Sequence, residues 1–140
     1  MKAFRRRTLA AIAMLAAGSI TAIGIADLRA EDAQIERTEL MNVPLGVAEG
    51  VDGVMVLSVL PPGGVAPKHH HPADEFSYVL EGAITLTVEG SDPVTYEAGE
   101  SYHIHPGIPH SATNASETEP TRILVFWTAE AGKPLTEMDE

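Results

Sequence analysis

The strongest constraint on the fold is a pattern of short apolar runs separated by glycine and proline. From residue 53 to residue 128, turns recur about every 6–12 residues, and no segment after residue 30 shows a helical period. Residues 83–89 alternate, with Ile84, Leu86 and Val88 on one face and polar side chains on the other. Short strands with such frequent turns are typical of a sandwich or a barrel. We therefore expect an all-β fold.

The same pattern suggests where the domain begins and ends. Strands are expected at 53–60, 76–80, 94–97, 101–105, 110–113 and 121–128, and Phe76, Tyr78 and Leu80 share one face of the second. Residues 31–52 are expected to form an N-terminal arm, in which residues 34–41 either form a short strand or have no regular structure. The barrel covers 53–129, and the polar tail, 130–140, is expected to be loose. No repeat or linker indicates a second domain.

Residues 1–30 have the composition of a signal peptide and are left out of the fold. Basic residues gather in the first seven positions, and residues 8–26 carry no charge. This is the order of a secretory signal. Cleavage is expected after Ala30, with Ala26 as the alternative. The Arg6–Arg7 pair fits an ordinary positive segment or a twin-arginine signal, and an uncleaved anchor also stays open. Each reading predicts a periplasmic or secreted protein.

Charge and cysteine content exclude several classes of partner. Residues 1–30 hold five of the nine basic and one of the 20 acidic residues, so four basic and 19 acidic residues remain, a formal charge of −15. Such a surface repels nucleic acid and anionic membranes, so we expect no nucleic-acid partner and no stable membrane association after cleavage. The chain has no cysteine. A metal would therefore be held by imidazole and carboxylate.

A histidine run at 69–71 carries the main functional signal. On a strand, residues i and i+2 share a face, so His69 and His71 point together and His70 points away. Glu75 follows a three-residue turn that can return its carboxylate to the same side. This pattern predicts metal ligands, although a solvated loop could also carry such a cluster.

Two spaced motifs over residues 54–127 then resemble the cupin superfamily. The residues of the first are Gly63, His69, His71, Glu75 and Gly82, and those of the second are Gly99, Gly107, His110 and Asn114. The chain departs from the pattern at His105, where the family usually has proline. That departure concerns the shape of the loop and leaves the spacing of the ligands intact.

The resemblance implies a single small jelly-roll β-barrel with a site inside it. It implies one divalent transition metal ion bound by His69, His71, Glu75 and His110, with two coordination positions open. Nitrogen and oxygen ligands suit iron, manganese, nickel, copper or zinc and disfavour calcium.

For several other residues the sequence allows two locations or roles. His103 and His105 either face the cavity, as hydrogen-bond donors or acid–base groups, or face solvent. His70 is expected to be exposed or bonded to a neighbour, and Asp74 to lie on the surface. Four aromatic residues either line the pocket or pack in the core: Phe76, Tyr78, Tyr102 and Trp127.

The functional hypotheses fall into three classes. The preferred one is a metal-dependent enzyme, dioxygenase-like, that acts on a small organic molecule with Glu75 as a base. A redox-neutral isomerase or lyase would use the metal as a Lewis acid instead. A non-catalytic binder of a metabolite or metal is the second class, and a structural module with a vestigial site is the third. A homodimer is plausible because a domain this small buries only a modest share of its surface.

Overall fold

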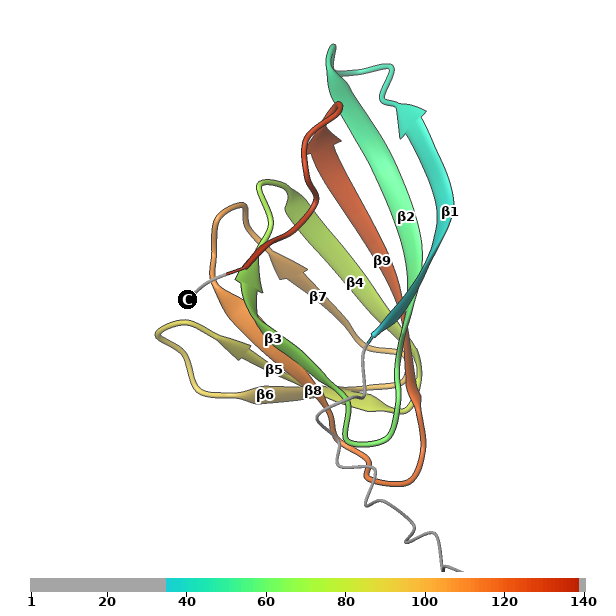
Figure 1. Cartoon of the computed structure of the whole chain (residues 1–140), viewed down its shortest axis with the longest axis vertical. Helices are drawn as coiled ribbons and strands as arrows, with labels where there is room; N and C mark the ends of the chain where they lie inside the picture. The colour runs from blue at the N-terminus through green and yellow to red at the C-terminus, as the bar shows by residue number, and fades with distance from the viewer. Residues whose placement is uncertain (1–34, 139–140) are drawn as a thin grey trace, which may run out of the picture.

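The computed structural model describes residues 35–138, which form ten strands and no helix (Figure 1). The strands are β1 (Glu36–Pro44), β2 (Val51–Leu60), β3 (Val65–His70), β4 (Asp74–Glu81), β5 (Ala83–Val88), β6 (Val94–Glu97), β7 (Ser101–Ile104), β8 (His110–Asn114), β9 (Thr121–Glu130) and β10 (Glu137–Met138). The predicted signal peptide at 1–30, with both cleavage positions, and the first residues of the arm lie outside the described residues. Among residues 35–138, no helix could cross a membrane.

The strands form two five-stranded antiparallel sheets. One has the order β1-β2-β9-β4-β7, and the other has the order β10-β3-β8-β5-β6. Figure 1 shows them as two layers, with the chain after β9 crossing from the first sheet to reach β3 in the second. The all-β expectation is confirmed, and the two antiparallel sheets match a jelly roll.

The core lies between the sheets and follows from the alternation of side chains along each strand. On β9, Ile123, Val125 and Trp127 are buried, and on β5 Ile84 and Leu86 are buried. Successive strand residues point to opposite faces, so these side chains meet in one interior. The strand pattern predicted at 83–89 is confirmed.

Strand β4 faces the other way from what its apolar residues suggest. Phe76 and Tyr78 are 46% and 45% exposed, whereas Glu75, Ser77 and Val79 are buried. The expectation that Phe76 and Tyr78 line the pocket or pack in the core is therefore wrong. The physical reason is that the interior here is polar, so the inward face of β4 carries the site and the outward face carries the large apolar side chains.

Both ends of the described chain are tied to the sheets. The predicted arm contains β1, which pairs with β2 from Glu36 opposite Val59 to Pro44 opposite Asp52. The tail is not loose as expected: β10 pairs with the edge of β3, and Leu135 packs against the core. Polar composition hid this docking, because main-chain pairing and a single apolar anchor order the segment.

Gly82, the last residue of the first motif, is fixed by its backbone and its surroundings. Its φ is +76°, a conformation that other residues rarely adopt, and a Cβ there would lie 2.6 Å from Thr121 Oγ1. Glycine at this position therefore allows the β4–β5 turn to sit against the start of β9.

Asn114, the last residue of the second motif, joins three segments. Its side-chain nitrogen donates to the main-chain oxygens of Leu60, Pro61 and Glu119 at 3.2, 2.9 and 2.8 Å. Its Oδ1 accepts from Ser116 N and Thr121 Oγ1 at 2.9 and 2.8 Å. Asn114 is 2% exposed, so these bonds are shielded from water. They fix the end of β8, the strand that begins with His110.

Candidate metal centre

Three elements bring the four predicted ligands together inside the fold. His69 is on β3, and His71 is the first residue after that strand ends. Glu75 is on β4, and His110 is the first residue of β8. His69 and His110 are direct cross-strand partners. All four are at most 5% exposed, and the histidine ring centroids are 4.3–5.2 Å apart. The alternation that placed His69 and His71 inward is confirmed, although β3 itself ends at His70.

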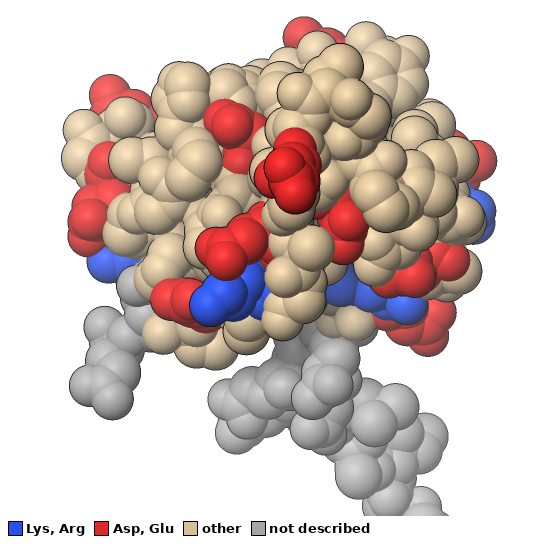
Figure 2. Space-filling model, turned by 90° about the horizontal axis from the view of Figure 1, so that it is seen from above, with Lys and Arg blue, Asp and Glu red and all other residues tan. Residues whose placement is uncertain are grey.

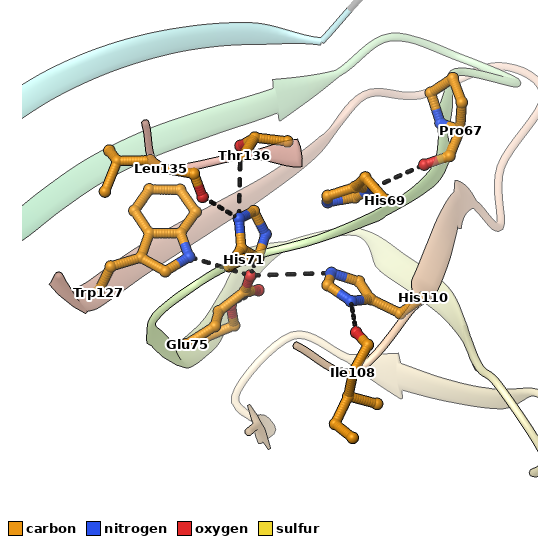
Figure 3. A network of polar contacts seen from close by, with 10 residues as sticks. Pro67, His69, His71, Glu75, Ile108, His110, Trp127, Leu135 and Thr136 are labelled. Carbon is orange, nitrogen blue, oxygen red and sulfur yellow. Dashed lines mark hydrogen bonds and ion pairs between the residues drawn. The ribbon is translucent and has the colours of Figure 1, made fainter. Parts of the chain in front are cut away.

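Each of the three histidines has its Nδ1 held by a main-chain carbonyl (Figure 3). The partners are Pro67 O for His69 at 2.7 Å, Leu135 O for His71 at 2.5 Å and Ile108 O for His110 at 2.9 Å. A carbonyl only accepts, so Nδ1 carries the proton in each ring. In a neutral ring of this kind Nε2 is the nitrogen with the lone pair, and it is the atom that a metal would take. At His71 the 2.9 Å contact of Nε2 with Glu75 Oε2 requires a proton on Nε2 as well, and a metal would displace that proton.

Four side chains surround the carboxylate of Glu75. Ser77 Oγ donates to Oε1 at 2.8 Å, and Trp127 Nε1 donates to Oε2 at 3.2 Å. His71 Nε2 lies 2.9 Å from Oε2, and His110 Nε2 lies 3.9 Å from it. Burial alone would raise the pKa of Glu75, but the hydrogen bonds from His71 and Ser77 and the charges of His71 and His110 outweigh it and keep that pKa below its usual value. The carboxylate is therefore ionised at neutral pH.

The ligands face a small cavity of about 40 Å³. Its wall is mostly apolar and includes Trp127, Tyr102 and Arg37, the last of which comes from β1. About 10–15 Å³ is needed for each water molecule, so the space fits an ion with a few small ligand atoms. An apolar wall with few polar groups is typical of a site that orients a small molecule.

Electrostatics around the cavity favour a neutral imidazole at His69 and a neutral phenol at Tyr102. Burial lowers the pKa of His69 to about 4, and the neighbouring His110, His71 and Arg37 act in the same direction against the hydrogen bond to Pro67. Burial, together with the charge of Glu75, raises the pKa of Tyr102 above its usual value. The ring of His69 is thus neutral and can offer its lone pair to a metal, and the Tyr102 hydroxyl keeps its proton.

The donor set fits a divalent transition metal. Ligand atoms of His69, His71 and His110 all lie within 4.8 Å of one another, and the Glu75 carboxylate adds a negative charge beside them. Imidazole and carboxylate suit iron, manganese, nickel, copper and zinc, and a buried set with this many nitrogens disfavours calcium. The fold thus holds a candidate metal site, and the role of each residue as a ligand remains a prediction.

The other predicted candidates lie away from the cavity. His103 lies on β7 and His105 directly follows that strand, with the buried Ile104 between them. Both histidines are exposed and lie beside Asp74. They do not face the cavity, because alternation along β7 turns Ile104 inward and its neighbours outward. His70 Nε2 lies 3.1 Å from Glu137 Oε2 on β10. Of the four aromatic candidates, only Tyr102 and Trp127 line the cavity.

Sequence reasoning missed three contributors to the site. Ser77, two residues after Glu75, could have been found because i and i+2 share a face of a strand. Arg37 reaches the cavity from a segment whose strand character was left open, and its role depends on the pairing of β1 with β2. No sequence signal could have pointed to the Leu135 carbonyl, since every residue has a main-chain carbonyl.

Comparison with protein families gives a match over most of the described chain. A family model described as a cupin domain matches residues 56–127, more than half of the chain. Among curated proteins, the HTH-type transcriptional regulator PuuR of Escherichia coli (strain K12) is 41% identical over 63 residues. That match covers 44% of this chain but only 34% of the regulator, so the similarity concerns one part of it.

Solved structures give the same fold. The DMSP lyase DddQ from Ruegeria pomeroyi DSS-3 has a TM-score of 0.60 at 23% identity, over 74% of this chain and 51% of that one. A recombinant oxalate oxidase in complex with glycolate has a TM-score of 0.57 at 27% identity, over 74% of this chain and 54% of the oxidase. This chain therefore spans about half the length of both structures.

Proposed function

The chain belongs to the cupin family, and from that premise we propose that it is a metal-dependent, dioxygenase-like enzyme that acts on a small organic molecule bearing a carboxylate. The residues that would hold the metal are His69, His71, His110 and Glu75. When bound, such an ion supplies Lewis-acid polarisation and, for a redox metal, a path for electrons to dioxygen.

One observation carries the proposal. Three buried histidines have their Nδ1 protons committed to the main-chain oxygens of Pro67, Leu135 and Ile108, which orients three Nε2 atoms toward the same cavity as an ionised carboxylate. Burying charged and polar groups costs free energy even when they are paired, so a structural role alone would be met at lower cost by apolar side chains. Buried histidines and a carboxylate that are oriented toward one cavity are expected where these groups bind a ligand.

Arg37 supports an anionic substrate. It is one of only four basic residues beyond position 30, and it lines the cavity close enough for its charge to act on His69. A guanidinium can bind a carboxylate through two parallel hydrogen bonds. The similarity to an oxalate oxidase that carries glycolate agrees with a small carboxylate, at 27% identity.

Glu75 and Tyr102 support the chemistry. Ser77 and Trp127 hold the carboxylate of Glu75, and its lowered pKa keeps it ionised, the form that can accept a proton from a substrate in the cavity. The raised pKa of Tyr102 keeps its hydroxyl protonated, so it can donate a hydrogen bond to a developing negative charge. Both groups line a cavity whose wall is mostly apolar, and such a wall strengthens the electrostatic interactions inside it.

The test is turnover by the metal-loaded chain. Untagged protein would be loaded separately with iron, manganese, nickel, copper or zinc and incubated in air with a panel of small hydroxy acids, keto acids, diketones, phenols and flavonols. Oxygen uptake with product formation is expected for at least one carboxylate, and Glu75→Gln should abolish it while the fold persists.

The other outcomes separate the alternatives. Product without oxygen uptake would replace oxygen chemistry with a redox-neutral isomerase or lyase reaction. Thermal stabilisation by a ligand with neither product nor oxygen uptake, across all five metals, would contradict an enzyme and leave a binding protein.

A further inference from the structure

A second group of metal-ligating side chains lies on the outer face of the sheet. Asp74 Oδ1 is 2.8 Å from His103 Nε2 and 3.6 Å from His105 Nδ1, and one ligand atom of each residue lies within 4.8 Å of the others. We propose that Asp74, His103 and His105 form a second divalent-metal site, distinct from the interior one, which takes zinc, copper or nickel.

Strand register explains why these three residues meet. On the antiparallel β4–β7 pair, Glu75 lies opposite Ile104 and Phe76 lies opposite His103. One step further in the same register brings Asp74 opposite His105. Glu75 and Ile104 point inward and are buried, so their neighbours along each strand point outward together. Side chains that face each other across an antiparallel pair are about 4.5–5.5 Å apart at Cβ, which is within reach of one ion.

The distances suit a small ion. Two ligands at about 2.0–2.1 Å in tetrahedral geometry are about 3.3 Å apart, and the observed 2.8 and 3.6 Å contacts lie on either side of that value. An ion would replace the proton between Asp74 and His103. His105 is 76% exposed at its side chain and can turn to complete the set without moving the backbone.

The surroundings favour a bound cation of borderline softness. The Phe76 ring stacks on His103 at 4.6 Å between centroids and 14° between planes, which orients the imidazole. Figure 2 shows a face of the molecule on which Asp and Glu are more widespread than Lys and Arg, so the surface potential draws in cations. Two imidazoles with one carboxylate select zinc, copper or nickel over calcium and magnesium, and three protein ligands leave a position open to solvent.

The two sites are independent because their residues occupy opposite faces of the same strands. The neighbouring residues Asp74 and Glu75 belong to different sites. On β7 the buried side chain of Ile104 separates the outward-facing histidines from the interior. Loss of the outer residues should therefore leave the interior site and any activity intact. The outer site can also exist if the interior chemistry proposed above is wrong.

The test counts zinc ions in the untagged, metal-stripped chain by equilibrium dialysis and elemental analysis. About two ions per chain are expected for the unaltered protein, and about one for His103→Gln with His105→Gln. His70→Gln is the matched control: it removes one histidine outside both sites and should leave the count unchanged. Equal counts in the double variant and the unaltered protein would overturn the proposal.

A second readout needs no variant. Diethyl pyrocarbonate modifies exposed imidazole, and mass spectrometry locates the modified residues. Saturating zinc should reduce modification of His103 and His105 at least tenfold. Unchanged modification of both residues at saturating zinc would overturn the proposal whatever the variants do.

Discussion

Removing the C-terminal segment tests how the fold prepares His71 for a metal. Deletion of residues 134–140 takes away Leu135 O, which accepts from His71 Nδ1 at 2.5 Å, and Thr136 Oγ1, which lies 3.3 Å from the same atom. It also removes β10 from the edge of β3, the strand that carries His69. His71 would then lose the contact that fixes its ring and its proton on Nδ1.

The expected effect is a fall in metal affinity of about 10- to 100-fold, the usual cost of losing a hydrogen-bond partner behind a histidine ligand. This corresponds to about 1.4–2.7 kcal/mol of binding free energy. Competition with a fluorescent zinc chelator would measure it, in a background of His103→Gln and His105→Gln so that only the interior site reports.

Two matched variants separate the carbonyl from the rest of the tail. Deletion of residues 139 and 140 alone should leave the affinity unchanged, because it keeps β10 and Leu135. Leu135→Ala keeps the carbonyl and removes only side-chain packing, so it should weaken binding less than the long deletion does. An affinity within twofold of the unaltered chain after the long deletion would refute the role given to the tail.

Three further predictions concern stability, substrate and pH. Asn114→Ala removes five hydrogen bonds inside the fold and should lower the free energy of urea unfolding by about 3–5 kcal/mol; a loss below about 1 kcal/mol would contradict the anchoring role. Arg37→Leu should raise KM for a carboxylate substrate at least tenfold with unchanged metal content, Arg37→Lys should raise it less, and equal KM values would exclude a guanidinium contact. In the metal-free chain, the pKa of His69 is 6.5 when unfolded and about 4 when folded. The unfolded chain therefore binds the proton first, and the free energy of unfolding should fall as the pH drops from 6.5 to 4. Below pH 4 this residue should cause no further change. Urea unfolding at several pH values checks this, with His69→Gln as control, and an identical pH dependence in the control would contradict it.

Alternation along strands accounts for the part of the site that sequence predicts well. His69 and His71 share a face because they are two residues apart, and the cavity lies on that face. The same rule explains Ser77 beside Glu75, a contact that could have been read from the spacing. His110 came from the resemblance to cupins, and the structure brings it opposite His69.

The same rule misleads where the interior is polar. On β4 the apolar residues Phe76 and Tyr78 suggested an inward face, yet that face belongs to Glu75, Ser77 and Val79. Apolar content marks the buried face of a strand only if the core behind it is apolar. A strand that lines a site reverses this signal, and in that case the position of the predicted ligand is the better guide to its orientation.

Contacts between distant segments could not be predicted from one sequence. Docking of the tail depends on main-chain pairing between β10 and β3, about 67 residues apart, and the Leu135 carbonyl has no distinguishing chemistry. Arg37 reaches the cavity only because β1 pairs in one register with β2. Asp74 meets His103 and His105 by the register of β4 with β7. Each is a consequence of strand pairing, which local patterns do not encode.

The central claim is that His69, His71, His110 and Glu75 hold one metal ion inside the fold, and zinc stoichiometry tests it most directly. The untagged chain with His103→Gln and His105→Gln should bind about one ion at the interior site. Adding His110→Gln should lower the affinity at least 100-fold with the fold retained, as judged by circular dichroism. Binding of the ion with the same affinity after loss of His110, or no binding by the parent chain, would contradict the account.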